Sequence, residues 1–278
     1  AIAQEVPEFS ELAADSANWR EAAPENLIQF RIQDGRGAER GVVLVEMAPF
    51  SAPGHIERFQ ALVASGDLNG TVFHRVIDDF MSQGGDVEQI STEKAENWPE
   101  IPGEFVFTRH PLDADDTVPP MQKLGPNSSA TDGYILGFPV QTQSEYLASL
   151  TKDASVESWI AHCPGVASTA RTTDPNSATT QFFLMRGTAD FLDRQYTAWG
   201  RVVHGQEIVE TMKTGEPVRL PEVLISAKMV SDMPEADRPR VLVQKTDGPA
   251  FASVLQENAG ANVCDLPAVP SVAMFPED

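Results

Sequence analysis

One arginine and two glutamines lie among apolar residues in two segments that are about 100 residues apart. Arg75, Met81 and Gln83 belong to the first segment, and Gln181 and Phe183 belong to the second. Side chains two positions apart in a strand share a face, so Met81 would lie beside Gln83, and Gln181 beside Phe183. Together with Arg75, these residues predict a shallow apolar floor with one fixed cation and two neutral amides at its rim.

Such a set can bind and polarise a substrate, but it contains no nucleophile and no paired acid and base. The chain has no Gly-rich phosphate loop, no G-x-S-x-G elbow and no H-E-x-x-H motif. His74 lies within an apolar strand pattern, which favours a structural histidine over a general base. The five histidines are scattered and Cys163 and Cys264 lie far apart, so we expect no metal and no cofactor. The alternative, that these are ordinary core strands, explains the phenylalanines and Met81 but not an arginine and two glutamines.

These residues belong to three blocks, which in chain order are FHRVIDDFMSQGGD, NSATTQFFLM and FLDRQYTAWGRVVHGQEIV. The blocks resemble the cyclophilins, the peptidyl-prolyl cis-trans isomerases, and the resemblance runs from about residue 26 to 232 with one interruption. It implies an all-β fold with a few helices, built as a closed eight-stranded antiparallel barrel capped by two helices. It also implies that the protein isomerises X-Pro bonds of proline-containing peptides or unfolded protein clients, assisting folding, without a covalent step.

The family's site combines an arginine, an apolar pocket for the proline ring and amides that hold the peptide. The resemblance therefore assigns catalysis to Arg75 and Gln83. It assigns substrate binding to nine further residues, which are Phe80, Met81, Ala170, Arg171, Gln181, Phe183, Phe191, Leu192 and Tyr196. Among these, Ala170 and Arg171 would form the strand that pairs with a bound peptide.

A few positions depart from the best-known members of that family. Phe191 stands where a tryptophan is common, Tyr196 where a histidine is common, and Arg171 where an asparagine is more usual. The edge of the pocket is therefore altered while its apolar character is kept. The second function that these residues allow is a non-catalytic module that binds proline peptides in the same groove, which the bulk of the additional segments would favour.

Several elements must position these residues. Alternating apolar residues predict a hairpin over residues 28–47, with its turn at 34–37. Pro53 and Gly66 mark the start and end of a helix. A strand follows over 223–229, with residues 223, 225, 227 and 229 on one face.

The remaining segments predict additions to this body. Residues 87–162 carry seven prolines and form an insertion rather than part of the barrel, with helix signals over 144–162. Residues 1–23 predict a short helix, and 241–244 predict a strand. We therefore divide the chain into an N-terminal helical extension (1–25), the barrel (26–232) and a C-terminal extension packed on it (233–278).

Charge excludes some partners. The chain has 20 Lys and Arg against 41 Asp and Glu, which gives a formal charge of −21. So negative a surface repels nucleic acid and anionic lipid, because both are bound mainly through Lys and Arg. The longest apolar runs of the chain are of strand length, so no membrane insertion is expected. We also expect a monomer.

Two features bear on the compartment. Ala1-Ile2-Ala3 has the small-x-small form of a signal-peptidase site, which favours a periplasmic or otherwise exported protein over a cytoplasmic one. In an oxidising compartment, Cys163 and Cys264 would form a disulfide that fixes the C-terminal tail to the body. The other possibility is two separate buried thiols.

Overall fold

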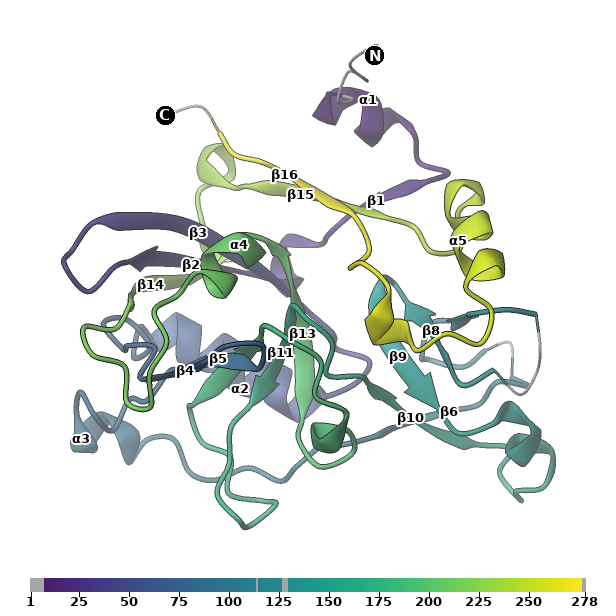
Figure 1. Ribbon diagram of the computed structural model, residues 1–278, viewed down its shortest axis with the longest axis horizontal. Coiled ribbons are helices and arrows are strands. Elements are labelled where there is room, and N and C mark those ends of the chain that lie inside the picture. Colours follow the sequence, from purple (N-terminus) through teal and green to yellow (C-terminus); the bar gives the residue numbers. More distant parts are fainter. Residues whose placement is uncertain (1–7, 114, 127–129, 277–278) are drawn as a thin grey trace.

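The computed structural model describes residues 8–113, 115–126 and 130–276, which form three antiparallel sheets (Figure 1). The largest has eight strands in the spatial order β14-β2-β3-β13-β11-β12-β5-β4. In chain order they are β2 (Leu27–Gln33), β3 (Glu39–Met47), β4 (Arg75–Ile77), β5 (Met81–Gly84), β11 (Val166–Thr169), β12 (Phe182–Met185), β13 (Ala198–His204) and β14 (Val223–Met229). The mostly-strand fold and the hairpin β2–β3 agree with the predictions.

The eight-stranded sheet is strongly curled and open, whereas the sequence predicted a closed barrel. Among the described residues no ladder joins its edge strands, β14 and β4; an isolated bridge, Val72 with Val223, lies ahead of β4. Val76 of β4 instead exchanges two backbone hydrogen bonds with Gly215, each 2.9 Å long. The outer edge of β4 is therefore paired with the loop before β14 and not with β14 itself.

Helix α2 (Pro53–Ser65) begins and ends where the sequence predicts. Pro53 occupies the first turn, where its missing N–H is not needed, and Gly66 ends the helix in the left-handed conformation with φ of 76°. Its buried face packs on the curled sheet, and the Phe59 ring stacks on Trp199 of β13 with 4.1 Å between centroids. The short helix α4 (Gln206–Glu210) packs near β3.

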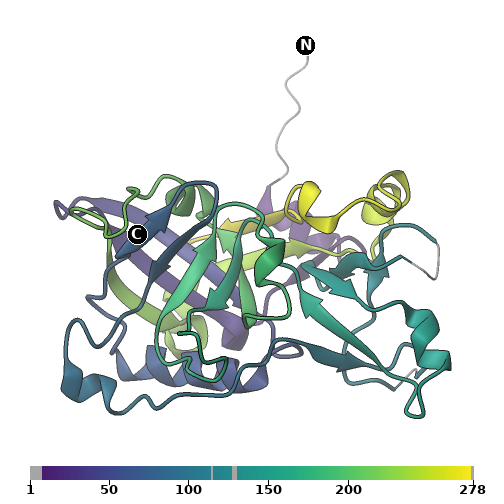
Figure 2. The same ribbon diagram turned by 60° about the horizontal axis from the view of Figure 1, so that its bottom comes forward.

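The insertion forms a five-stranded sheet of its own, which lies beside the curled sheet in both views (Figure 2). Its strands are β6 (Phe107–Arg109), β7 (Gln122–Lys123), β8 (Asp132–Ile135), β9 (Phe138–Thr142) and β10 (Val156–Ile160), and helix α3 (Thr92–Ala95) precedes them. The helix predicted over 144–162 is wrong, because only a 3₁₀ turn, Glu145–Ser149, forms before β10. Alternate residues Val156, Ser158 and Ile160 are buried in β10, so this segment has the period of a strand.

The third sheet joins the two ends of the chain, in the order β1-β15-β16. Its strands are β1 (Trp19–Glu21), β15 (Arg240–Gln244) and β16 (Ser271–Met274). The helix predicted over 1–23 shrinks to α1 (Phe9–Ala14), since Trp19 pairs with Gln244 in a strand, and residues 1–7 lie outside the described residues. The strand predicted at 241–244 is β15, and helix α5 (Ala252–Glu257) follows it.

The face predicted for β14 is wrong in its first half, because the strand contains a bulge. The pairing of β14 with β2 shifts between Leu224 and Ser226, so Leu224 becomes buried along with Ala227 and Met229. A bulge places two residues opposite one, which moves the side chains before it to the other face. Short 3₁₀ turns complete the described chain at Pro24–Asn26, Asp190–Leu192, Val230–Asp232, Glu235–Asp237, Pro249–Phe251 and Val263–Asp265.

Candidate active site

Strand register places Arg75, Gln83 and Phe183 in one row across three neighbouring strands. Arg75 of β4 lies opposite Gln83 of β5, and Gln83 lies opposite Phe183 of β12. Neighbouring strands are about 4.8 Å apart, so these side chains share one face of the sheet. The preceding residues of β5 and β12, Ser82 and Phe182, point to the other face of the sheet and are fully buried.

A hollow of about 110 Å³ lies over this row. Nine of the eleven predicted site residues line it: Arg75, Phe80, Met81, Gln83, Ala170, Arg171, Phe183, Leu192 and Tyr196. Met81, Phe183 and Leu192 form a buried apolar floor, each at most 5% exposed. The structure thus brings together the guanidinium groups of Arg75 and Arg171, the amide of Gln83 and an apolar pocket from segments about 100 residues apart.

A chain of polar contacts holds the Arg75 guanidinium beside this floor. Arg75 Nη1 donates to Gln83 Oε1 at 3.3 Å, and Gln83 Nε2 donates to Gln181 Oε1 at 2.9 Å. The guanidinium carbon lies 6.0 Å from the centre of the Phe80 ring. Gln181, the tenth predicted residue, therefore acts through Gln83 rather than as part of the wall.

Sequence reasoning missed Glu216, whose Oε1 lies 2.5 Å from Arg75 Nε in an ion pair. The loop that carries it runs along β4: Gly215 pairs with Val76, and the Val218 N–H donates to the His74 carbonyl at 2.8 Å. Glu216 is thereby held directly opposite Arg75. No motif or spacing marks this residue in the sequence, because it reaches Arg75 only through the edge pairing of β4.

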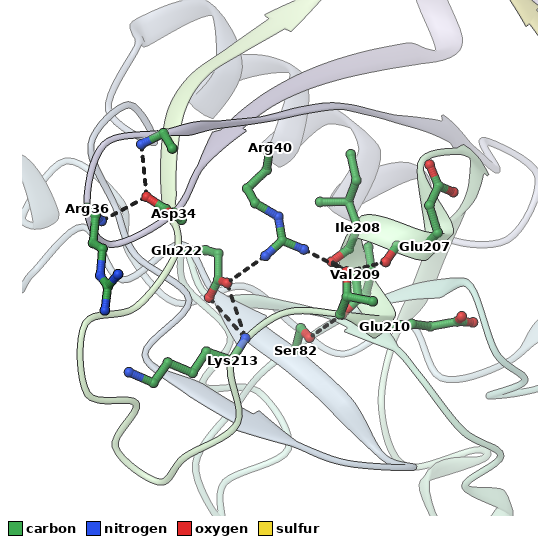
Figure 3. Close-up of polar contacts among 12 residues, drawn as sticks. Asp34, Arg36, Arg40, Ser82, Glu207, Ile208, Val209, Glu210, Lys213 and Glu222 are labelled. Carbon is green, nitrogen blue, oxygen red and sulfur yellow. Dashed lines mark hydrogen bonds and ion pairs between the residues drawn. The ribbon is translucent and has the colours of Figure 1, made fainter.

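The base of that loop is closed by the carboxylate of Glu222, which is buried (Figure 3). Both of its oxygens accept from the Lys213 backbone N–H at 3.2 Å, and Arg40 forms an ion pair with it at 3.3 Å. Ser82 of β5 donates to the Val209 carbonyl at 3.3 Å, which ties the preceding helix to the site strand. Loop 213–222 is therefore anchored at its base and along its inner edge.

Two residues predicted to bind substrate, Phe191 and Arg171, lie at the edge of the pocket with their side chains engaged by other residues of the protein. Phe191 is 62% exposed and packs against the Phe80 ring at 5.6 Å, so it stands outside the hollow. The Arg171 guanidinium stacks over Tyr196 at 4.3 Å and donates twice to the Gln195 carbonyl. The Arg171 side chain is therefore held at the rim of the hollow by these contacts. The backbone of residues 170–171 continues directly from β11.

A buried Ser–His–Asp set lies beneath the floor. His162 Nδ1 is 2.8 Å from Asp193 Oδ1, and Nε2 is 3.0 Å from Ser168 Oγ. These are the distances of an acyl-transfer triad, but Ser168 is fully buried and donates its hydroxyl to the Thr197 carbonyl. Since the His162 ring also stacks on Phe183 at 6.2 Å, the set supports the floor and does not act as a nucleophile.

The described residues contain no group of three His, Cys, Asp or Glu side chains that could hold a metal ion. Within the same ranges, none of the helices has the length and apolar character needed to cross a bilayer.

The chain is similar to known peptidyl-prolyl isomerases over most of its length. The family model "Cyclophilin type peptidyl-prolyl cis-trans isomerase/CLD" matches residues 28–231. A probable peptidyl-prolyl cis-trans isomerase of Brucella suis is 29% identical over 216 residues, which is 76% of this chain and 86% of the relative. The peptidyl-prolyl cis-trans isomerase cyp18 of Streptomyces antibioticus is 29% identical over 68% of this chain and 93% of its own.

One solved structure also matches the additional segments. The crystal structure of cyclophilin AquaCyp293 from Hirschia baltica superposes with a TM-score of 0.89 and 39% identity. The match covers 98% of this chain and 100% of that one, so the insertion and both extensions have counterparts there. Together with the residues gathered in the hollow, these matches show that the chain belongs to the cyclophilin family of peptidyl-prolyl cis-trans isomerases.

Proposed function

We propose that the hollow isomerises X-Pro bonds of peptides and unfolded protein clients, with Arg75 as the group that stabilises the transition state. The observation that carries this proposal is the position of the Arg75 guanidinium, held beside the apolar floor by Glu216 and Gln83. The floor of Met81, Phe183 and Leu192 matches an apolar five-membered ring better than a charged side chain.

The mechanism follows from the physics of the amide. Rotation about an X-Pro bond passes a barrier of about 20 kcal/mol because conjugation is lost at the twisted geometry. There the prolyl nitrogen regains a lone pair, so a donor placed against it favours the twisted state over the planar one. A guanidinium suits this role because it stays charged and presents its donors in a rigid fork.

The two glutamines support this step. Gln83 accepts from Arg75 and donates to Gln181, which orients both its amide and the guanidinium. The second N–H of Gln83 can hold the substrate carbonyl, and the backbone of Ala170 and Arg171 can pair with the peptide. A 10⁵-fold acceleration requires about 7 kcal/mol, which a charge-assisted hydrogen bond, desolvation and positioning can supply together.

Substitution of Arg75 tests the proposal. Arg75→Ala is expected to lower kcat/KM on an Ala-Pro peptide by about 100-fold or more, by analogy with removing a transition-state donor. Arg75→Lys is expected to recover little, because an ammonium lacks the fork. The measurement is cis–trans exchange followed by NMR, with circular dichroism to check folding.

The matched control is Arg194→Ala, since Arg194 pairs with Glu157 outside the hollow. It should leave turnover unchanged. Equal turnover in wild type and Arg75→Ala would exclude the mechanism. Retained peptide binding without measurable turnover in the wild type would favour the second candidate, a non-catalytic binding module, which the bulk of the insertion and tail suggests.

We further propose that residues 26–232 form the catalytic unit of an exported, monomeric protein, with 1–25 as an N-terminal extension and 233–278 as a C-terminal extension packed on that unit. The disulfide between Cys163 and Cys264 supports export, because such bonds persist in oxidising compartments. Packing of the tail is supported by the Ser271 hydroxyl, which donates to the Val203 carbonyl at 2.6 Å. Thiol titration of protein taken from its native compartment and size-exclusion chromatography test these two points.

A further inference from the structure

A second cavity, of about 150 Å³, lies where the insertion sheet, the curled sheet and the C-terminal tail meet. It shares no lining residue with the hollow of the active site. Tyr134 of β8, Arg201 of β13 and Val269 of the tail contribute to its buried interior, and most of the remaining wall is apolar. The exposed residues Pro164, Pro267 and Ala268 stand at its mouth.

Arg201 is buried but only partly satisfied. Its Nε lies 3.6 Å from Glu46 Oε2, and its Nη1 donates to the Val269 carbonyl at 3.3 Å. The guanidinium carbon lies 5.4 Å from the centre of the Phe138 ring. Nη2 is buried and has no hydrogen-bond partner among the described residues.

The charges around Arg201 do not balance. Glu46 is shared with Arg20, which donates to both of its oxygens at 2.6 and 3.0 Å. Two guanidinium groups therefore face one carboxylate, and within the described ranges no second carboxylate lies within ion-pair distance of Arg201. Burial lowers the pKa of Arg201 to about 10, with Glu46 acting against this, as expected for an incompletely compensated charge.

Tyr134, which also lines this cavity, carries a second buried donor. The Tyr134 hydroxyl is buried and has no hydrogen-bond partner among the described residues. Burial raises the pKa of Tyr134 to about 12, so the phenol is neutral at pH 7. Gly137 lies beside the Arg201 guanidinium, since a Cβ at this position would lie 3.1 Å from Nη2.

We propose that this cavity binds a small monocarboxylate with a short apolar body. The carboxylate would accept from Arg201 Nη2 and the Tyr134 hydroxyl, and supply the missing negative charge. The body would fill the apolar part, since a cavity of this volume in another protein accommodates a ligand of about six non-hydrogen atoms, benzene. Burial of two unpaired donors costs free energy, which such a ligand would recover. This inference is independent of the proposed isomerase mechanism.

The test compares isobutyrate with its neutral isostere, isobutyramide, on the full-length, disulfide-bonded protein at constant ionic strength. Isobutyrate is expected to raise Tm and to give a saturable isotherm by calorimetry, whereas isobutyramide and sodium chloride should do neither at equal concentration. Tyr134→Phe removes only an unpaired hydroxyl, so it should fold normally and weaken isobutyrate binding by about tenfold. Arg201→Met should abolish binding, and Tyr146→Phe, at an exposed tyrosine, is the matched control.

Three outcomes would overturn the proposal. The first is equal binding of isobutyrate and isobutyramide, which would make the cavity simply apolar. The second is equal binding of chloride, which would leave no role for the apolar body. The third is unchanged isobutyrate affinity in Tyr134→Phe. The Tyr134→Phe measurement decides the matter even if Arg201→Met fails to fold.

Discussion

At the residue scale, Arg75 is held by a carboxylate that lies outside the three motif blocks. Glu216 accepts from Nε and Gln83 accepts from Nη1, while the Arg75 side chain stays 34% exposed. The pair also lowers the net charge of the groove. Two effects therefore oppose each other, since fixing the guanidinium aids catalysis and neutralising it weakens its field. We expect positioning to dominate, because an exposed ion pair is worth only about 0–1 kcal/mol in water.

Glu216→Ala is accordingly expected to lower kcat by about three- to tenfold with little change in KM. Glu216→Gln should recover part of this loss, because its amide oxygen can still accept from Nε. The difference between Glu216→Gln and wild type should shrink in 1 M salt, which screens the charge. Steady-state kinetics at two ionic strengths measures all three quantities, and a Glu216→Ala variant as fast as wild type would rule out a positioning role.

Most residues of the hollow could be predicted because they lie within the three motif blocks, whereas Ala170 and Arg171 lie just before the second block. Arg75 and Gln83 share one short segment, and the two-residue period of a strand places Met81 beside Gln83. The structure also places Phe191 and the Arg171 side chain at the rim, which the motif alone did not distinguish. Glu216 could not be predicted, since its approach depends on which backbone covers the edge of β4.

At the element scale, the N-terminus of α2 depends on a residue from the insertion. Glu104 accepts from the backbone N–H groups of Gly54 and His55 and lies 2.7 Å from His55 Nδ1. Burial alone would raise the pKa of Glu104, but these hydrogen bonds outweigh burial and lower it below its ordinary value of 4.5. The insertion is thus fixed to the helix that packs on the curled sheet.

Glu104→Gln is expected to cost about 1–2 kcal/mol of unfolding free energy at pH 7. A carboxyl whose folded pKa is lowered stabilises the protein above its unfolded pKa, and this contribution disappears as the pH falls through the folded pKa. The gap between wild type and Glu104→Gln should therefore narrow below about pH 4.5. Urea denaturation between pH 7 and pH 3 measures it. Glu100→Gln, at an exposed neighbouring position, should show no gap, and a pH-independent gap for Glu104→Gln would contradict the assignment.

Elements with clear periodicity were predictable, and those set by distant partners were not. Helix α2 and the hairpin β2–β3 follow from capping residues and alternation. The segments of β10 and β1 are short, and their conformation is decided by pairing with β6, β9 and β15. Long-range pairing overrides local propensity in such short strands.

At the scale of the whole molecule, a covalent bond joins the tail to the body at the second cavity. Cys163 precedes β11 and Cys264 lies in the tail, 101 residues further along. Replacing both by alanine is expected to cost about 3–5 kcal/mol, since a loop of this length gains much chain entropy when it is opened in the unfolded state. Denaturant unfolding of the oxidised and variant proteins measures the loss.

Isomerase activity of the folded double variant should stay near that of wild type, because neither cysteine lines the hollow. Loss of activity at temperatures where the variant remains folded would show that the tail acts on the groove. The sequence left two possibilities for these cysteines, because pairing across 101 residues depends on tertiary structure that no local pattern specifies.

The sheet β1-β15-β16 has a consequence for how the chain is made. Trp19 in β1 pairs with Gln244 in β15, so this strand has no partner in the nascent polypeptide until residue 244 has left the ribosome. At ordinary synthesis rates the delay is about 10 to 45 s. The curled sheet, whose last strand ends at Met229, can form before then. Pairing of β1 with β15 therefore comes later than synthesis of the curled sheet, and the indole at position 19 is placed to report this pairing.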